Sequence, residues 1–98
     1  MRSVVFAPSF DAEFSDILNY VEDRFGVKSA DQYQAKLTRT TLNLAHMPMI
    51  GTQDHGYGTV LFAILLYPNW IFYRFTDEEV HFLHIRSGRM AKFGQQFE

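Results

Sequence analysis

The sequence predicts an α+β fold: an N-terminal strand, an antiparallel two-helix hairpin, and then a three-stranded antiparallel meander, with all strands forming one sheet. Apolar residues in the first half of the chain recur at the spacing of one helix face. The second half instead holds short runs of aromatic and β-branched residues separated by turn residues. A chain of 98 residues suits one hydrophobic core, so we expect residues 1–98 to form a single domain.

The first strand and the first helix are predicted from the opening residues. Residues 4–7 form a short apolar run that ends at Pro8, which is typical of a strand that enters a turn. Ser9 follows and is expected to cap the helix. The apolar face of this helix consists of Phe10, Phe14, Ile17, Leu18, Val21 and Phe25. Gly26 is typical of the residue that ends a helix.

The second helix is predicted to begin at Ser29, because Ser29 and Gln32 have the spacing of a capping box. Its apolar stripe consists of Ala30, Tyr33, Leu37, Thr41 and Leu44. Pro48 ends the helix, since proline lacks an amide hydrogen and disfavours helix in the residue before it. Only residues 26–28 separate the two helices, which predicts an antiparallel hairpin.

The sheet is predicted from the remaining residues. Residues 49–57 are predicted to form a loop, because glycine and polar residues interrupt any periodicity there. Three runs rich in aromatic and β-branched residues follow at 60–66, 70–75 and 80–85. The segments between these runs are short enough for hairpins, so the runs predict an antiparallel meander.

Composition excludes several classes of protein. The chain has no cysteine, so it has neither disulfides nor thiolate metal ligands. Its opening residues lack a secretory signal, and its longest apolar run, 60–67, is too short to span a bilayer; we therefore expect a cytoplasmic protein with no membrane contact. His81 and His84 are three apart on a strand and are expected to point to opposite faces. We therefore expect no metal ion and no cofactor.

The net charge of −2 is unlike that of most proteins that bind nucleic acid through a basic face. Acidic residues crowd the first predicted helix. Near the C-terminus, however, Arg86, Arg89 and Lys92 follow one another with no acid between them. The sequence therefore predicts a local basic patch despite the overall charge.

Basic and polar residues gather on one face of the last two predicted strands. Arg74 is expected to share a face with Phe72 and Thr76, because alternate residues of a strand lie on the same side of a sheet. Arginines on such a face can bind phosphodiesters or an acidic protein surface, although antiparallel sheets also carry ordinary solvated residues there. The candidate target-binding residues are Tyr73, Arg74, His84, Arg86, Arg89 and Lys92.

Four stretches in this order resemble the RelE/ParE toxin superfamily. They are the opening VVFAPSFDAEFSDILNY, the passage AHMPMIG with its Pro-x-x-Gly, the hairpin IFYRFTDEEVHFLHI and the tail RSGR. Together they span nearly the whole chain. The resemblance implies the toxin of a type II toxin–antitoxin system, of the ParE-like plasmid-stabilisation kind, which a cognate antitoxin binds and neutralises in a hetero-oligomer.

The superfamily implies two modes of action. RelE-like members cleave messenger RNA on the ribosome with basic residues, whereas ParE-like members poison DNA gyrase and are not known to need a catalytic constellation. Three positions depart from the superfamily pattern. Trp70 and His84 stand where many members have arginine, and Ser87 stands where they have histidine. A nuclease needs well-placed cations to stabilise the developing negative charge on the pentavalent phosphate. These departures therefore weaken the hypothesis that the chain cleaves RNA.

The first hypothesis is therefore a ParE-like, non-catalytic inhibitor of DNA gyrase. An alternative is a RelE-like mRNA endoribonuclease, ribosome-dependent or free, in which Arg74, His84, Arg86 and Arg89 act on the scissile phosphate. A degenerate, non-toxic member that only binds its antitoxin also fits the departures.

Overall fold

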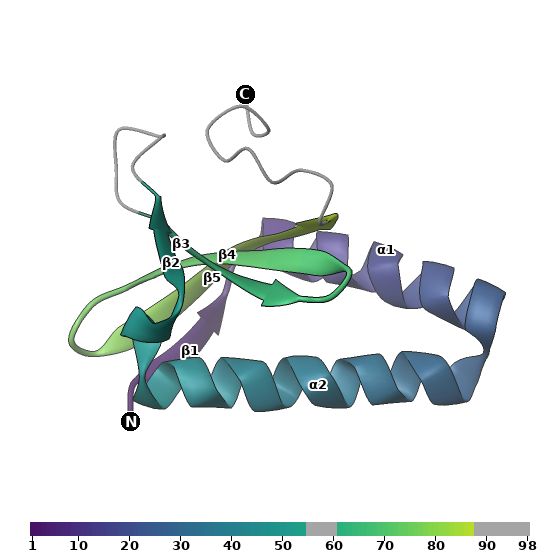
Figure 1. Cartoon of the computed structure of the whole chain (residues 1–98), viewed down its shortest axis with the longest axis horizontal. Helices are drawn as coiled ribbons and strands as arrows, with labels where there is room; N and C mark the ends of the chain where they lie inside the picture. Colours follow the sequence, from purple (N-terminus) through teal and green to yellow (C-terminus); the bar gives the residue numbers. More distant parts are fainter. Residues whose placement is uncertain (55–60, 88–98) are drawn as a thin grey trace.

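The computed structural model describes residues 1–54 and 61–87 of the chain. The elements in chain order are β1 (Ser3–Phe6), α1 (Pro8–Phe25), α2 (Val27–His46), the 3₁₀ turn η1 (Pro48–Ile50), β2 (Thr52–Asp54), β3 (Leu61–Leu66), β4 (Asn69–Phe75) and β5 (Glu79–Ser87). The two helices form an antiparallel hairpin, and the end at which they join lies beyond the sheet (Figure 1). The predicted α+β class is confirmed.

The strands form one five-stranded sheet in the order β1-β5-β4-β3-β2. β1 is parallel to β5, and the other neighbours are antiparallel. The N-terminal strand therefore pairs with the last strand of the meander, so the prediction that both belong to one sheet is confirmed.

The loop predicted at residues 49–57 is wrong over part of its length. Thr52–Asp54 forms β2, which pairs antiparallel with Leu61–Ala63 of β3. The three residues lack the aromatic and aliphatic residues that mark a strand in a sequence. Their strand conformation depends on the neighbouring β3, so four strands, not three, follow the helices in the described part of the chain.

The predicted start of α1 is also wrong in detail. Ala7 occupies the N-cap, and Pro8 is at the start of the helix, where its missing N–H costs nothing and its fixed φ angle is already helical. The Ser9 hydroxyl does not cap the helix; it donates to the Leu83 carbonyl oxygen at 2.8 Å. Ser9 thus joins α1 to the sheet.

The helix α2 begins two residues before Ser29, and no capping box forms. The Ser29 hydroxyl instead donates to the Phe25 carbonyl oxygen at 3.2 Å. Gly26, with φ of 95°, separates the helices; glycine adopts this left-handed region at little cost. α1 therefore ends at Phe25, directly before Gly26, as predicted, and α2 ends at His46, before Pro48.

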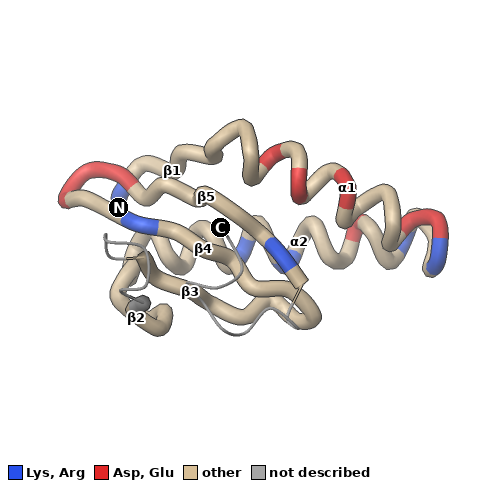
Figure 2. The backbone as a smooth tube through the Cα atoms, turned by 90° about the horizontal axis from the view of Figure 1, so that it is seen from above, with Lys and Arg blue, Asp and Glu red and all other residues tan. Residues whose placement is uncertain are grey.

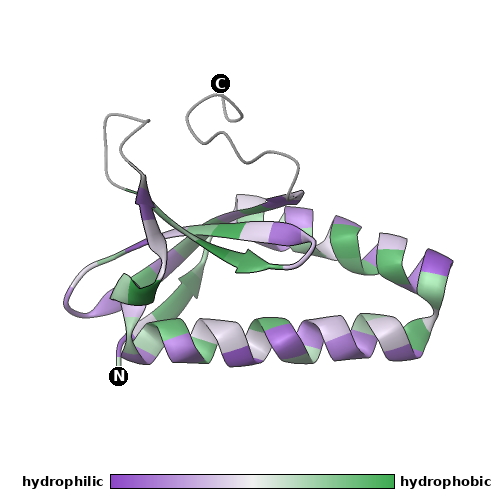
Figure 3. Ribbon diagram, in the orientation of Figure 1, coloured by the Kyte–Doolittle hydropathy of each residue, from purple (hydrophilic) through white to green (hydrophobic). Residues whose placement is uncertain are grey.

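The hydrophobic core lies between the helix hairpin and one face of the sheet, hereafter the helix face. All five residues of the predicted α2 stripe are buried. Opposite them, the helix face supplies Leu66, Ile71, Tyr73, Val80, Phe82 and Ile85. Hydrophobic and hydrophilic residues alternate along α2 (Figure 3), in agreement with a helix that packs on one side only.

The predicted apolar face of α1 is buried only near its start. Phe10 is 1% exposed, whereas Phe25 is 67% exposed, because the joined end of the hairpin extends past the sheet. Between them, Phe14, Ile17 and Leu18 pack against the core and are partly buried. Neither helix in the described ranges has the length and apolarity needed to cross a membrane.

Candidate functional site

A β-bulge in β5 decides which side chains share the outer face of the sheet, the face opposite the helices. Tyr73 pairs with Phe82, but the preceding Phe72 pairs with His84, so β5 carries an extra residue at Leu83. The bulge places His84 on the same face as His81, which pairs with Arg74. The expectation that the two histidines point to opposite faces is therefore wrong.

The position of the two histidines on one face does not by itself make a metal site. The described ranges contain no group of three or more histidine or carboxylate side chains that could hold a metal ion. His81 Nε2 lies 3.0 Å from the Glu79 carboxylate, its neighbour two positions along the strand.

The cations predicted to act together lie at separate places on the outer face. Arg74 pairs with His81, and Arg86 pairs with Trp70. Because Trp70 and Arg74 are four residues apart on β4, the backbone positions of the two arginines are separated along the strands by roughly 13 Å at about 3.3 Å per residue. The basic positions of the sheet also lie apart in Figure 2. Arg89 and Lys92, the other two predicted cations, lie outside the described residues.

Tyr73 does not lie with the candidate cations. It is on the helix face and is fully buried, so its position gives no support to the predicted contact with a target. Its hydroxyl donates to the Pro48 carbonyl oxygen at 2.7 Å and accepts from the Gly51 amide at 3.1 Å. Burial raises the pKa of Tyr73 to about 12. Tyr73 therefore fastens the segment after α2 to the sheet.

This contact explains the Pro-x-x-Gly passage noted in the sequence. A Cβ atom at Gly51 would overlap the Tyr73 hydroxyl and lie 2.9 Å from the Ala63 carbonyl oxygen. Only glycine leaves space for the hydroxyl to bond both Pro48 and Gly51. The passage is structural, and it sets the start of β2.

A cluster at the junction of α1 and β5 centres on the Glu13 carboxylate. Its Oε2 accepts from Arg86 Nε at 2.8 Å, and its Oε1 accepts from the Ile85 backbone amide at 3.1 Å. His84 Nδ1 lies 3.2 Å from the same Oε1 and 3.3 Å from Arg86 Nη2. Two predicted site residues, His84 and Arg86, are thus brought together, but around an acidic residue that the sequence analysis did not select.

The same junction covers the edge of β5 beyond the end of β1. The Ala7 amide donates to the Phe82 carbonyl oxygen at 2.9 Å, and Ser9 and Glu13 bond the next polar backbone groups of β5. The start of α1 therefore takes the place of a paired strand at this edge, which protects it from pairing with another chain. Acidic positions are spaced along α1 (Figure 2), and only the fold singles out Glu13 among them.

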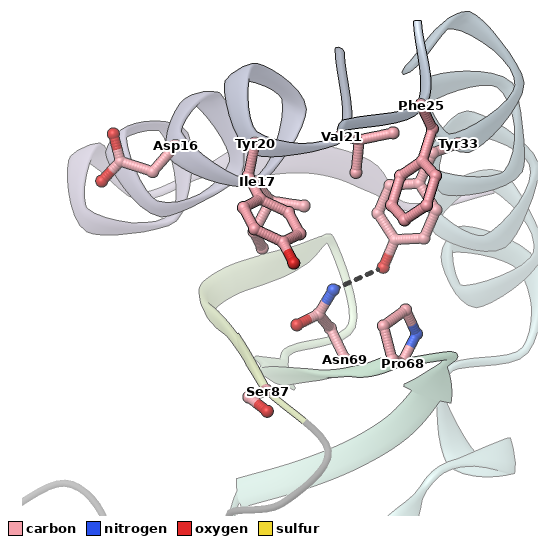
Figure 4. A pocket seen from close by; sticks show the side chains of 9 residues that line it. All are labelled: Asp16, Ile17, Tyr20, Val21, Phe25, Tyr33, Pro68, Asn69 and Ser87. Carbon is pink, nitrogen blue, oxygen red and sulfur yellow. Dashed lines mark hydrogen bonds between the residues drawn. The ribbon is translucent and has the colours of Figure 1, made fainter. Parts of the chain in front are cut away.

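A second feature is an open cleft of about 490 Å³ between α1 and the β3–β4 turn (Figure 4). It is lined by Asp16, Ile17, Tyr20, Val21, Phe25, Tyr33, Pro68, Asn69 and Ser87. At its base, the Asn69 amide donates to the Tyr33 hydroxyl at 2.9 Å. Tyr20 and Phe25 at its rim are 54% and 67% exposed. Exposed apolar side chains beside a cleft are typical of a surface that binds another protein.

These features define a small α+β protein with separated cations on one sheet face and an apolar cleft beside the helix hairpin. The chain belongs to the family of ParE toxins of type II toxin–antitoxin systems (parDE), whose model matches residues 4–92. A solved structure described as a chromosomal ParDE TA system from P. aeruginosa is similar in fold: the TM-score is 0.74 at 16% identity, over 89% of this chain and 96% of that one. Among curated proteins, a sequence search found no significant match.

Proposed function

We propose that the chain acts in the cytoplasm as a non-catalytic inhibitor of DNA gyrase and that a cognate antitoxin neutralises it. The main support is the arrangement of the cations. Cleavage of a phosphodiester needs several cations that converge on one phosphate. Here Arg74 lies roughly 13 Å from the position of Arg86 along the sheet, and Glu13 neutralises Arg86.

An inhibitor that acts by contact needs a complementary surface rather than a reaction centre. Arg74 is exposed on the outer face, and no acidic side chain of the described ranges lies within salt-bridge distance of it. Exposed arginines and aromatic residues are the side chains that most often dominate the binding energy of protein interfaces. Arg74 is therefore our first candidate for a contact with gyrase.

The antitoxin is proposed to use the cleft beside α1. The family description names a toxin–antitoxin system and so implies an antitoxin partner. Apolar side chains line most of the cleft, and the joined end of the hairpin exposes Phe25 and Val27 nearby. A segment of the antitoxin that inserts apolar side chains there would cover this surface, as amphipathic helices do in apolar grooves.

One observation favours a second function, the cleavage of messenger RNA. His84 and Arg86 lie side by side on the outer face, 3.3 Å apart at their nearest nitrogens. An imidazole beside a guanidinium is a pair that can transfer a proton and stabilise phosphate charge. Detection of mRNA cut within codons when the chain is expressed, with DNA supercoiling unchanged, would replace the gyrase proposal with this one.

Arg74→Ala tests the proposed contact. We expect the concentration needed for half-inhibition of gyrase supercoiling to rise about tenfold, which corresponds to about 1.4 kcal/mol of lost binding energy. Stability should change by less than about 0.5 kcal/mol, because the side chain is exposed. Arg39→Ala, which removes an exposed arginine of α2, is the matched control and should leave both quantities unchanged. Equal potency of the two variants would remove Arg74 from the interface.

A further inference from the structure

The groups around Glu13 form a binding site for an oxyanion. A backbone amide, a guanidinium and an imidazole, all from Ile85 and its two neighbours on β5, converge on its two carboxylate oxygens. These groups come from one strand, whereas the carboxylate comes from α1, 71 to 73 positions earlier in the chain. Arginine and backbone N–H donors arranged in this way also bind phosphate oxygens.

The site reaches solvent. The side chains of Glu13, His84 and Arg86 are 25%, 28% and 28% exposed. A dissolved anion can therefore approach the donors that bind the Glu13 carboxylate.

We propose that Glu13 blocks a latent phosphate-binding site formed by Arg86, His84 and the Ile85 amide, and that loss of its charge opens this site to phosphate and phosphodiester groups. The carboxylate acts in two ways. It fills the position in which a phosphate oxygen would bind, and its negative charge repels an incoming phosphate at short range. Phosphate binding at this site is independent of whether gyrase is the target, because the site consists only of groups of this chain.

Glu13→Gln is the sharpest test, because it removes the charge and keeps an oxygen that can accept from the Ile85 amide. The isotope-labelled full chain is titrated with inorganic phosphate at constant ionic strength, and the backbone amide signal of Ile85 is followed by NMR. We expect a saturable shift in the variant, with an apparent dissociation constant at least about tenfold lower than in the wild type.

Two controls separate the site from a general effect of charge. Glu22→Gln makes the same change in net charge at an exposed position of α1 and should behave as the wild type. In the double variant Glu13→Gln/Arg86→Gln the gain should disappear. A gain of the same size in Glu22→Gln, or its persistence without Arg86, overturns the proposal.

Glu13→Ala keeps the proposal testable if the glutamine side chain stays in the site, because alanine removes the whole acceptor group that Glu13 supplies. It should also gain phosphate binding, and its amide spectrum reports whether the chain is folded. Failure of both folded variants to bind phosphate more tightly than the wild type contradicts the proposal.

A second probe, a short single-stranded oligoribonucleotide followed by fluorescence anisotropy, distinguishes the sources of the phosphate. Oligoribonucleotide binding that appears with Glu13→Gln and disappears in the double variant Glu13→Gln/Arg86→Gln assigns the site to backbone phosphodiesters. Binding of inorganic phosphate alone, with the same dependence on Arg86, assigns it to free phosphate. The gyrase proposal is tested separately, by the supercoiling assay on the wild-type chain, so failure of one proposal can be told from failure of the other.

Discussion

Phe82→Ala is expected to lower the free energy of unfolding by about 3–5 kcal/mol, as for other large-to-small changes of buried aromatic residues. Phe82 is fully buried. Its ring centroid lies 5.3 Å from that of Phe6, 6.0 Å from that of Phe10 and 5.8 Å from that of Tyr73. The substitution opens a cavity where β1, α1, β4 and β5 meet. Urea unfolding followed by circular dichroism measures the loss.

Phe25→Ala is the matched control for this prediction, because the same atoms are removed from a side chain that is 67% exposed. Its effect should stay within about 0.5 kcal/mol. Small domains are stable by only about 5–15 kcal/mol, so the Phe82 variant should be partly unfolded at moderate temperature. Equal losses in the two variants would place the core elsewhere.

Tyr73→Phe is expected to lower the free energy of unfolding by about 1–3 kcal/mol, because it removes a hydroxyl that is the partner of one buried and one partly buried backbone group. Those groups are the Pro48 carbonyl, at 2.7 Å, and the Gly51 amide, at 3.1 Å. The measurement is urea unfolding near neutral pH. Tyr67→Phe, at a side chain that is 80% exposed, serves as the control and should have no effect. A Tyr73→Phe variant as stable as the wild type would refute the role given to the hydroxyl.

The pH dependence of stability gives this prediction a second readout. Burial raises the pKa of Tyr73 from 10.0 to about 12 in the folded state. The stability that protonated Tyr73 contributes is fully present below pH 10 and is lost as the pH rises to 12, because the hydroxyl proton of Tyr73 dissociates at lower pH in the unfolded chain than in the folded one. The wild type should lose about 2–3 kcal/mol over this range through Tyr73. Burial also raises the pKa of Tyr33. The Tyr73→Phe variant should therefore still lose stability over this pH range, but less than the wild type.

Local periodicity predicted the α2 stripe and the three longer strands of the meander. Each of these patterns is complete within one element, so the sequence contains what is needed to find it. Phe25 shares the spacing of the α1 stripe and yet is exposed. Spacing reveals which face of a helix is apolar, but the length of the sheet decides how much of that face is covered.

The candidate site was less predictable because it depends on contacts between distant residues. The bulge at Leu83 sets the face on which His84 lies, and a run of apolar residues does not reveal a bulge. Glu13 meets Arg86 only after β1 and α1 have docked against β5. Tyr73, by contrast, could have been excluded from the sequence, since it is adjacent to Arg74 and neighbours in a strand face opposite sides.

The central proposal, that this ParE-family chain inhibits DNA gyrase by contact, is tested most directly with purified components. The full chain is added to DNA gyrase and relaxed plasmid, and supercoiling and DNA cleavage are followed with and without the cognate antitoxin. We predict loss of supercoiling with accumulation of cleaved DNA, and recovery of supercoiling when the antitoxin is present. Full gyrase activity at saturating concentrations of the chain would contradict the proposal.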